Sequence, residues 1–297
     1  SNITSTAANI SWTPVGSATS WQYVCVAAGG TPDWSTASMV TNPSASLSNL
    51  SAYTNYDVYV RSYCSADDQS DPVKISFLTA VDCGTAEYRQ VNMGSGTYTS
   101  YYIPGYMSSS YPKADSWTIY PASEIIMYDV YEGLVKGVAY QTTTTASVES
   151  VKIYMANTEK TSFSSSSDTI SRDNMTLVYS GPIDFTANEW TEIAFNNAFS
   201  YDGHSNIALL FCRESAVTTS VYFKYTSVPS SSAYAYEYST GSRYAYTTTY
   251  RPNTRFTMCV NVPSCADVLS VNTYNVERYS MDISWMPRAT ANPTNYQ

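Results

Sequence analysis

Short strands of alternating polarity run along the whole chain of 297 residues. In the stretch "YDVYVRSY", Tyr56, Val58 and Val60 fall at every second position, which places them on one face of a strand. No segment shows a sustained apolar period of 3.6 residues, so few helices are expected. Residues 81–262 alone contain about ten such strands, a number that predicts a two-sheet jelly roll. The pattern therefore predicts an all-β chain.

The amino-acid composition also favours β-strands, and the net charge argues against some classes of binding partner. Charged residues make up only 13% of the chain, whereas tyrosine occurs 29 times, and aromatic residues favour strands. The net charge of −9 argues against nucleic acid as a partner, because phosphate binding needs clustered Lys and Arg. The sequence has no apolar run long enough for a membrane helix, so we expect no membrane insertion. It also has no signal-peptide pattern, so we expect a mature segment or an excised piece of a longer chain.

Residues 1–80 divide into strand-like runs with turn residues between them. Trp12, Trp21, Leu50 and Tyr56 are followed by the stretch "SFLTA", in the order of a fibronectin type III domain. Residues 1–80 resemble that domain over their whole length. The resemblance implies a β-sandwich in which Tyr56 is the corner tyrosine.

The end of the chain repeats its beginning. The sequence "DISW" at 282–285 echoes "NISW" at 9–12, so we expect residues 263–297 to start a second, incomplete fibronectin-like domain. Half a sandwich cannot bury a core by itself. A tandem array with a long period is the simplest account. The alternative is that these strands complete the N-terminal domain of a neighbouring chain by strand addition.

Four stretches of residues 81–262 carry a second resemblance: "VKGVAY", "VKIYMANTEKTSFSSSSDTI", "MTLVYSGPIDFTANEWTEIAF" and "FSYDGHSNIALLF". In this order they resemble a jelly-roll module of large secreted and surface proteins of Bacteroidota. The resemblance implies a module that alternates with fibronectin-like domains. The joints "LTAVDCG" and "CVNVPSC" are short and are not Gly/Ser runs, which predicts a stiff array.

Little in the sequence points to catalysis. His204 is the one histidine, and the Asp202-Gly203 turn before it indicates a solvated turn residue. Nothing places two carboxylates across a cleft, as glycoside hydrolysis requires. We therefore expect no enzyme and no cofactor. The candidate for a bound ion is a structural calcium held by Asp202 and Asn206, whose side-chain oxygens suit that ion. The alternative is that these two residues only stabilise the turn, as Asp and Asn commonly do.

The cysteines suit an oxidising, extracytoplasmic location rather than a metal site, because the six are scattered without a CxxC pair. Six cysteines allow 15 pairings, so the sequence does not assign them. Cys25 and Cys64 are expected on adjacent strands, which allows a bridge; alternatively, Cys64 pairs with a counterpart of Cys265. The triplet from Asp168 to Ile170 resembles the O-glycosylation sequence of Bacteroidota, which implies Thr169 as a glycan carrier.

The stretch "AYAYEYSTGSRYAYTTTY" (233–250) predicts a hairpin with tyrosine at alternate positions. A three-residue loop puts all its tyrosines on one face, and a loop of two or four residues puts the two rows on opposite faces. Gly241 sits centrally, which leaves the loop length open. Such rows could stack against the sugar rings of a ligand. Alternatively, the tyrosine rings pack half-buried in the sheet while their hydroxyls contact water, and this structural role is the interpretation we favour. The candidate aromatic face comprises Tyr234, Tyr236, Tyr238, Tyr244, Tyr246 and Tyr250.

These observations predict a non-catalytic repeat segment of a long extracellular adhesin or filament on a bacterial surface. The segment would act as a stalk that displays binding modules, with neighbouring repeats or adjacent copies as partners. The alternative is a carbohydrate-binding module of a secreted multidomain glycan-degrading protein, with glycans as ligands. A buried tyrosine face favours the stalk, and an exposed one favours the module.

Overall fold

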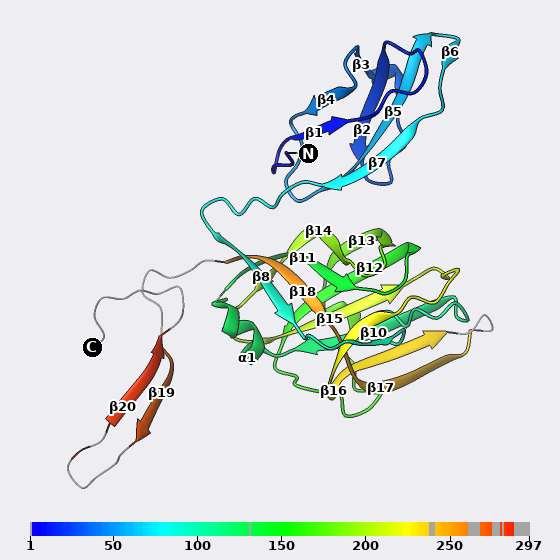
Figure 1. Cartoon of the computed structure of the whole chain (residues 1–297). Helices are drawn as coiled ribbons and strands as arrows, with labels where there is room; N and C mark the ends of the chain where they lie inside the picture. Colours follow the sequence, from blue (N-terminus) through cyan, green and yellow to red (C-terminus); the bar gives the residue numbers. More distant parts are fainter. Residues whose placement is uncertain are drawn as a thin grey trace. The chain divides into compact units, whose positions relative to one another are not determined.

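The computed structural model (Figure 1) describes residues 2–130, 132–237, 241–260, 268–274, 280 and 282–287. The chain divides into two compact units, Ser1–Asp82 and Cys83–Gln297. Strands dominate both, as predicted, and α1 (Ala122–Ile125) with the 3₁₀ turn η2 (Ile126–Tyr128) is a short interruption. In the part of the chain that is described, no helix is long and apolar enough to cross a membrane.

The first unit consists of two antiparallel sheets of unequal width. The narrow sheet pairs β1 (Ala8–Ser11) with β4 (Ser44–Leu47). The wide sheet has five strands in the order β3 (Ser38–Val40), β2 (Trp21–Ala27), β5 (Asn55–Ser65) and β6 (Asp68–Gln69), and β7 (Val73–Leu78) also pairs with β5.

The alternation predicted for Tyr56, Val58 and Val60 is confirmed. Val58 is fully buried in the core of the first unit, and Val60 packs against the same cluster. The backbone N–H of Ser51 donates a hydrogen bond of 2.9 Å to the hydroxyl of Tyr56. Tyr56 thus ties its strand to the preceding turn, the task of a corner tyrosine.

The second unit is built on two larger antiparallel sheets. One has seven strands in the order β13 (Thr176–Phe185), β12 (Ala146–Thr158), β15 (Asn206–Arg213), β10 (Lys113–Tyr120), β16 (Phe223–Glu237) and β17 (Arg243–Pro252), and β9 (Tyr98–Ser100) pairs with β16. The other has four strands in the order β14 (Trp190–Tyr201), β11 (Gly133–Gln141), β18 (Thr254–Val260) and β8 (Glu87–Met93).

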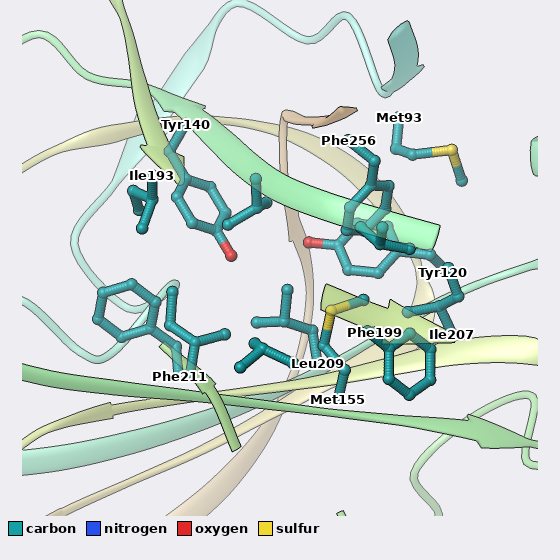
Figure 2. Close-up of a cluster of buried hydrophobic side chains, with 14 of the residues drawn as sticks. Met93, Tyr120, Tyr140, Met155, Ile193, Phe199, Ile207, Leu209, Phe211 and Phe256 are labelled. Atoms are coloured by element: carbon teal, nitrogen blue, oxygen red, sulfur yellow. The ribbon is translucent and has the colours of Figure 1, made fainter. Parts of the chain in front are cut away.

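The hydrophobic core of the second unit contains side chains from both of its sheets (Figure 2). The Tyr120 ring meets Phe256 edge to face at 5.0 Å between centroids, a favourable geometry for aromatic pairs. The Tyr120 hydroxyl lies 2.7 Å from that of Thr254, which satisfies a polar group at full burial. The unit is therefore a β-sandwich with an aromatic-rich core.

Beyond the sandwich, β19 (Val268–Tyr274) and β20 (Asp282–Pro287) form an antiparallel pair. Among the described strands, each of the two pairs only with the other. A strand is therefore present at "DISW", where the repeat predicts one.

Candidate functional site

The tyrosine-rich hairpin forms one edge of the seven-stranded sheet (Figure 1). Tyr234 pairs with Tyr246, and Tyr236 pairs with Tyr244, so these four side chains share one face. The shared face is the one expected for a three-residue loop, but the loop is longer: Glu237 pairs with Arg243, so five residues (238–242) separate the paired positions. Tyr238 lies outside the described residues.

This shared face is the inner face of the sheet. Tyr234 pairs with Ser116 of β10, four residues before Tyr120, whose ring lies in the core. Side chains two or four residues apart on a strand point to the same side. No described residue of β17 belongs to the hydrophobic core of the second unit. The tyrosines of the hairpin therefore extend the inner face of the sheet beyond that core.

A second tyrosine-rich stretch, "TYTSYYIPGYMSSSY" (97–111), covers this face. Tyr106 stacks on Tyr234 at 5.0 Å and on Tyr236 at 4.5 Å. Tyr102 stacks on Tyr234 at 5.2 Å and on Tyr250 at 5.9 Å. All four ring separations lie in the range of favourable aromatic pairs. Ring contacts join twelve residues, here called the tyrosine cluster: Tyr98, Tyr101, Tyr102, Tyr106, Tyr111, Tyr222, Tyr225, Tyr234, Tyr236, Tyr244, Tyr246 and Tyr250.

The tyrosine cluster has a buried layer and an exposed rim. Tyr106 and Tyr234 are 7% and 9% exposed, whereas Tyr244 and Tyr246 are 48% and 46% exposed. Burial, reinforced by neighbouring tyrosines, raises the pKa of Tyr234 to about 12 and holds the pKa of Tyr106 well above its ordinary value. These two hydroxyls are therefore protonated at neutral pH. The rim leaves aromatic rings exposed to solvent, and the buried layer holds the rim in place.

Arg213 holds the stretch 97–111 through its backbone carbonyls. Arg213 is the last residue of β15 and is 1% exposed. Every hydrogen bond described for its guanidinium is donated to a backbone carbonyl. Burial lowers the pKa of Arg213 to about 10, which still leaves it charged at neutral pH. The acceptors are the carbonyls of Gly105, Tyr106, Tyr111, Pro112 and Ser215. One side chain thus fixes both ends of the segment that carries Tyr106 and Tyr111.

The other face of the same sheet holds a charged cleft of about 440 Å³. Asp115 lies 2.7 Å from the Nη2 of Arg243 and 3.6 Å from that of Arg172. Burial raises the pKa of the adjacent Cys212 thiol, which therefore stays protonated. The one carboxylate of Asp115 thus lies between two guanidinium groups, and the Cys212 thiol is unreactive in its protonated form.

The turn predicted as a calcium site uses its oxygens internally. Asp202 Oδ1 accepts the backbone N–H groups of His204 and Ser205. Asn206 Oδ1 accepts the N–H of Ala122, and its amide donates to another carbonyl. Within the described ranges, no three His, Cys, Asp or Glu side chains are grouped as metal ligands. Calcium here stays a prediction. His204 is exposed, in agreement with a solvated turn residue.

The predicted Cys25–Cys64 bridge is wrong. Both thiols are free, and Cys25 pairs in register with Val58, six residues before Cys64. Six residues of strand span about 20 Å, whereas a disulfide needs Cα atoms within roughly 7 Å. The bridge that forms joins Cys83 to Cys259, with 5.3 Å between Cα atoms.

A further prediction concerns glycosylation. Thr169 is half-buried, beside Asp168, whose pKa is held well below its usual range by hydrogen bonds from Lys160 and Ser164. O-glycosylation of Thr169 stays a prediction. Three acids of the second unit form ion pairs: Glu124 pairs with Arg251, Glu192 with Arg255, and Asp168 with Lys160.

Comparisons with known proteins leave the family open. No family model matches the chain, and no curated protein matches it. Among solved structures, a β-sandwich protein redesigned by computer is 24% identical, covers 27% of this chain and 87% of its own, and has a TM-score of 0.23. Chitinase ChiA74 from Bacillus thuringiensis is 14% identical over 71% of this chain and 25% of its own, with a TM-score of 0.23. The infectious bursal disease virus Gx strain structure is 10% identical over 86% of this chain and 59% of its own, at 0.21. Scores this low carry no functional argument.

Proposed function

We propose that the chain is a non-catalytic stalk segment of an extracellular bacterial adhesin or filament, which displays binding faces away from the cell. The observation that carries this proposal is the Cys83–Cys259 disulfide. It links the first residue of the second unit to the penultimate residue of β18. Disulfides persist in oxidising, non-cytoplasmic compartments, which supports an extracellular location.

The disulfide determines how tension passes through the chain. Force applied between Asp82 and the residues after Val260 enters at Cys83 and leaves at Cys259. The S–S bond is a covalent shortcut between these points, and the sequence separation it spans is 176 residues. The sandwich inside this loop therefore bears no tension while the bond is intact. A filament subunit benefits from that arrangement, because its folded domain keeps its binding faces under load.

Force spectroscopy of the full chain, held by its two ends, tests the stalk. The oxidised chain is expected to show no extension step from the second unit. Reduction, or the double variant Cys83→Ser with Cys259→Ser, adds a step of about 600 Å, which is the extended length of that loop. Cys64→Ser is the matched control and leaves the trace unchanged. The same long step in the oxidised chain would refute the proposed load path.

The second candidate function is carbohydrate binding, favoured by the exposed rim of the tyrosine cluster. Tyr244 and Tyr246 are about half exposed on one strand face, and flat apolar faces stack on aromatic rings. A glycan array tests this with the double variant Tyr244→Ala, Tyr246→Ala. Saturable binding that this variant abolishes supports a carbohydrate-binding module; the absence of any bound glycan favours the stalk alone.

A further inference from the structure

Strand register gathers charged side chains at the cleft on the outer face of the seven-stranded sheet. In one row across three strands, Lys113 of β10 pairs with Glu237 of β16, which pairs with Arg243 of β17. Two positions along β10, Asp115 pairs with Cys212 of β15. Directly paired residues share a face, and so do residues two apart on a strand. Glu237 directly follows the inward-facing tyrosines of β16, so both rows face the side opposite the tyrosine cluster.

The charge balance of this cleft is opposite to that of the whole chain, which has 24 acidic and 15 basic residues. Four side chains that line the cleft are basic and three are acidic. Among the acids, Glu214 is already paired with Lys152, whose Nζ lies 2.8 Å from its carboxylate. Among the bases, Arg213 donates its described hydrogen bonds to carbonyls and not to carboxylates. The cleft is therefore a locally positive site on an acidic chain, and it favours an anion.

The two guanidinium groups beside Asp115 keep donors for a ligand. Arg243 reaches Asp115 through Nη2 at 2.7 Å, and the Nη2 of Arg172 lies 3.6 Å from the same carboxylate. The Nη2 of Arg172 also lies 3.1 Å from the Sγ of Cys212. A guanidinium has five N–H donors, and among the contacts described only the Nη2 of each group has a polar partner. The side chains of Arg243 and Arg172 are 49% and 44% exposed, so a ligand can reach them.

The lining selects a ligand that carries both a carboxylate and hydroxyl groups. A carboxylate accepts paired hydrogen bonds from a guanidinium, whereas Asp115 and Glu237 accept only from donors such as hydroxyls. Ala114 is the one apolar residue of the described lining, so the cleft does not suit a flat apolar ligand. A doubly charged phosphate would lie against two carboxylates, and like charges repel. A sugar with one carboxylate, a hexuronate, supplies the single anion and the hydroxyl donors together.

We propose that this cleft binds a hexuronate residue of an acidic polysaccharide. Arg172 and Arg243 hold the sugar carboxylate, Lys113 adds a third cation, and the sugar hydroxyls donate to Asp115 and Glu237. The volume of about 440 Å³ lies within the range of ligand sites, about 300–1,000 Å³. This site goes beyond the proposed stalk. It also differs from the tyrosine rim, which lies on the opposite face of the sheet and would stack on uncharged sugar rings.

Calorimetric titration of the full chain with tetragalacturonate, a linear oligomer of hexuronates, tests the site. The methyl ester of the same oligomer is the matched ligand, because it keeps the sugar rings and removes the charges. The acid is expected to bind at least ten times more tightly than the ester. Added salt is expected to weaken binding of the acid, because salt screens exposed charges. Equal affinity for acid and ester, which stacking on the tyrosine rim would give, would overturn the proposal, and so would no binding of the acid.

Variants of the basic side chains place the ligand in the cleft. Lys113 is exposed and has no ion pair among the contacts described, so Lys113→Gln leaves no carboxylate without its partner. Lys113→Gln is expected to weaken binding of tetragalacturonate at least threefold, and Arg172→Gln with Arg243→Gln at least tenfold. Lys136→Gln removes the same charge from β11 of the other sheet and is the control, with unchanged binding.

The remaining outcomes would overturn the proposal. Equal effects of Lys113→Gln and Lys136→Gln would show that net charge alone, and not the cleft, attracts the oligomer. A tetraglutamate peptide that binds as tightly as tetragalacturonate would show that the cleft recognises an acidic peptide instead of a sugar. Calorimetry of the cleft does not depend on the load path through Cys83 and Cys259, so the stalk and the hexuronate site can fail separately.

Discussion

Arg251 holds Glu124 through two parallel hydrogen bonds, Nη1 to Oε1 at 2.9 Å and Nη2 to Oε2 at 2.6 Å. Arg251 belongs to β17 and Glu124 to α1, so the pair ties the short helix to the edge of the seven-stranded sheet. The arginine side chain is 3% exposed and the glutamate side chain 42% exposed. A buried guanidinium thus depends on a carboxylate that water partly reaches.

Replacing Glu124 with Ala is therefore expected to destabilise the second unit by about 1–2 kcal/mol. The loss follows from stranding a buried charge and is reduced because water solvates the exposed side of the site. Urea unfolding checks it through the midpoint at constant m-value. Glu149→Ala, an exposed acid on β12, is the matched control. Equal midpoints for the two variants would show that the pair contributes nothing.

Reduction of the Cys83–Cys259 disulfide is expected to lower the free energy of unfolding of the second unit by about 2–5 kcal/mol. The bond closes a loop with a sequence separation of 176 residues, and long loops lose the most unfolded-state entropy. Denaturation with and without reductant measures the difference. Cys64→Ser in the oxidised chain is the control. A reduced chain as stable as the oxidised one contradicts the prediction.

The tyrosine cluster predicts unequal effects along the hairpin. Tyr234→Ala removes a buried ring that stacks on three others and is expected to cost about 3 kcal/mol of stability. Tyr246→Ala, on the exposed rim, is expected to cost less than about 1 kcal/mol. Chemical unfolding of the two variants gives the comparison. Equal losses would mean that the rim is as structural as the buried layer.

The sequence predicts the local parts of this fold well. Alternation in "YDVYVRSY" is enough to place Tyr56, Val58 and Val60 on one face, because side-chain direction has a period of two residues. The corner position of Tyr56 is expected from the resemblance and not from the alternation. The same rule predicts the tyrosine rows but leaves the register open, since the register depends on the turn. The observed pairing of Glu237 with Arg243 could not be read from the position of Gly241.

Contacts between residues far apart in the chain could not be predicted from the sequence. The stretch around Tyr106 is held by ring contacts to the hairpin and by Arg213, more than a hundred residues away, which donates to its carbonyls. Nothing in the sequence aims an arginine at backbone carbonyls. The pairing of Cys83 with Cys259 depends on neighbouring strands β8 and β18. Cys25 and Cys64 failed as a pair because adjacent strands do not by themselves bring two positions opposite each other.

Arg213 offers a direct test of how the tyrosine cluster is held. Arg213→Met keeps an unbranched apolar side chain in place of the arginine stem and removes the five hydrogen bonds that the guanidinium donates to carbonyls. Faster amide exchange is expected within residues 101–112, with a loss of stability of about 2–4 kcal/mol. Arg89→Met, on the more exposed edge strand β8, is the control. Unchanged exchange in that segment would show that ring stacking alone holds it.

Alkaline pH is expected to weaken the second unit through its buried tyrosines. Burial raises the pKa of Tyr120 to about 12 from an ordinary value of 10.0, so between these values the folded state binds more protons than the unfolded state. Stability is therefore fully present below pH 10 and falls as the pH rises towards 12. For the fully buried Tyr120 this amounts to about 2–3 kcal/mol.

Urea midpoints measured from pH 9 to pH 12 check this dependence. Tyr120→Phe loses the hydrogen bond to Thr254 and starts lower at pH 9 by about 1 kcal/mol. Its stability then declines less steeply above pH 10, because the titrating hydroxyl is gone. Tyr88→Phe, an exposed tyrosine on β8, is expected to follow the unmodified chain. Parallel declines for Tyr120→Phe and the unmodified chain would place the alkaline sensitivity in other groups.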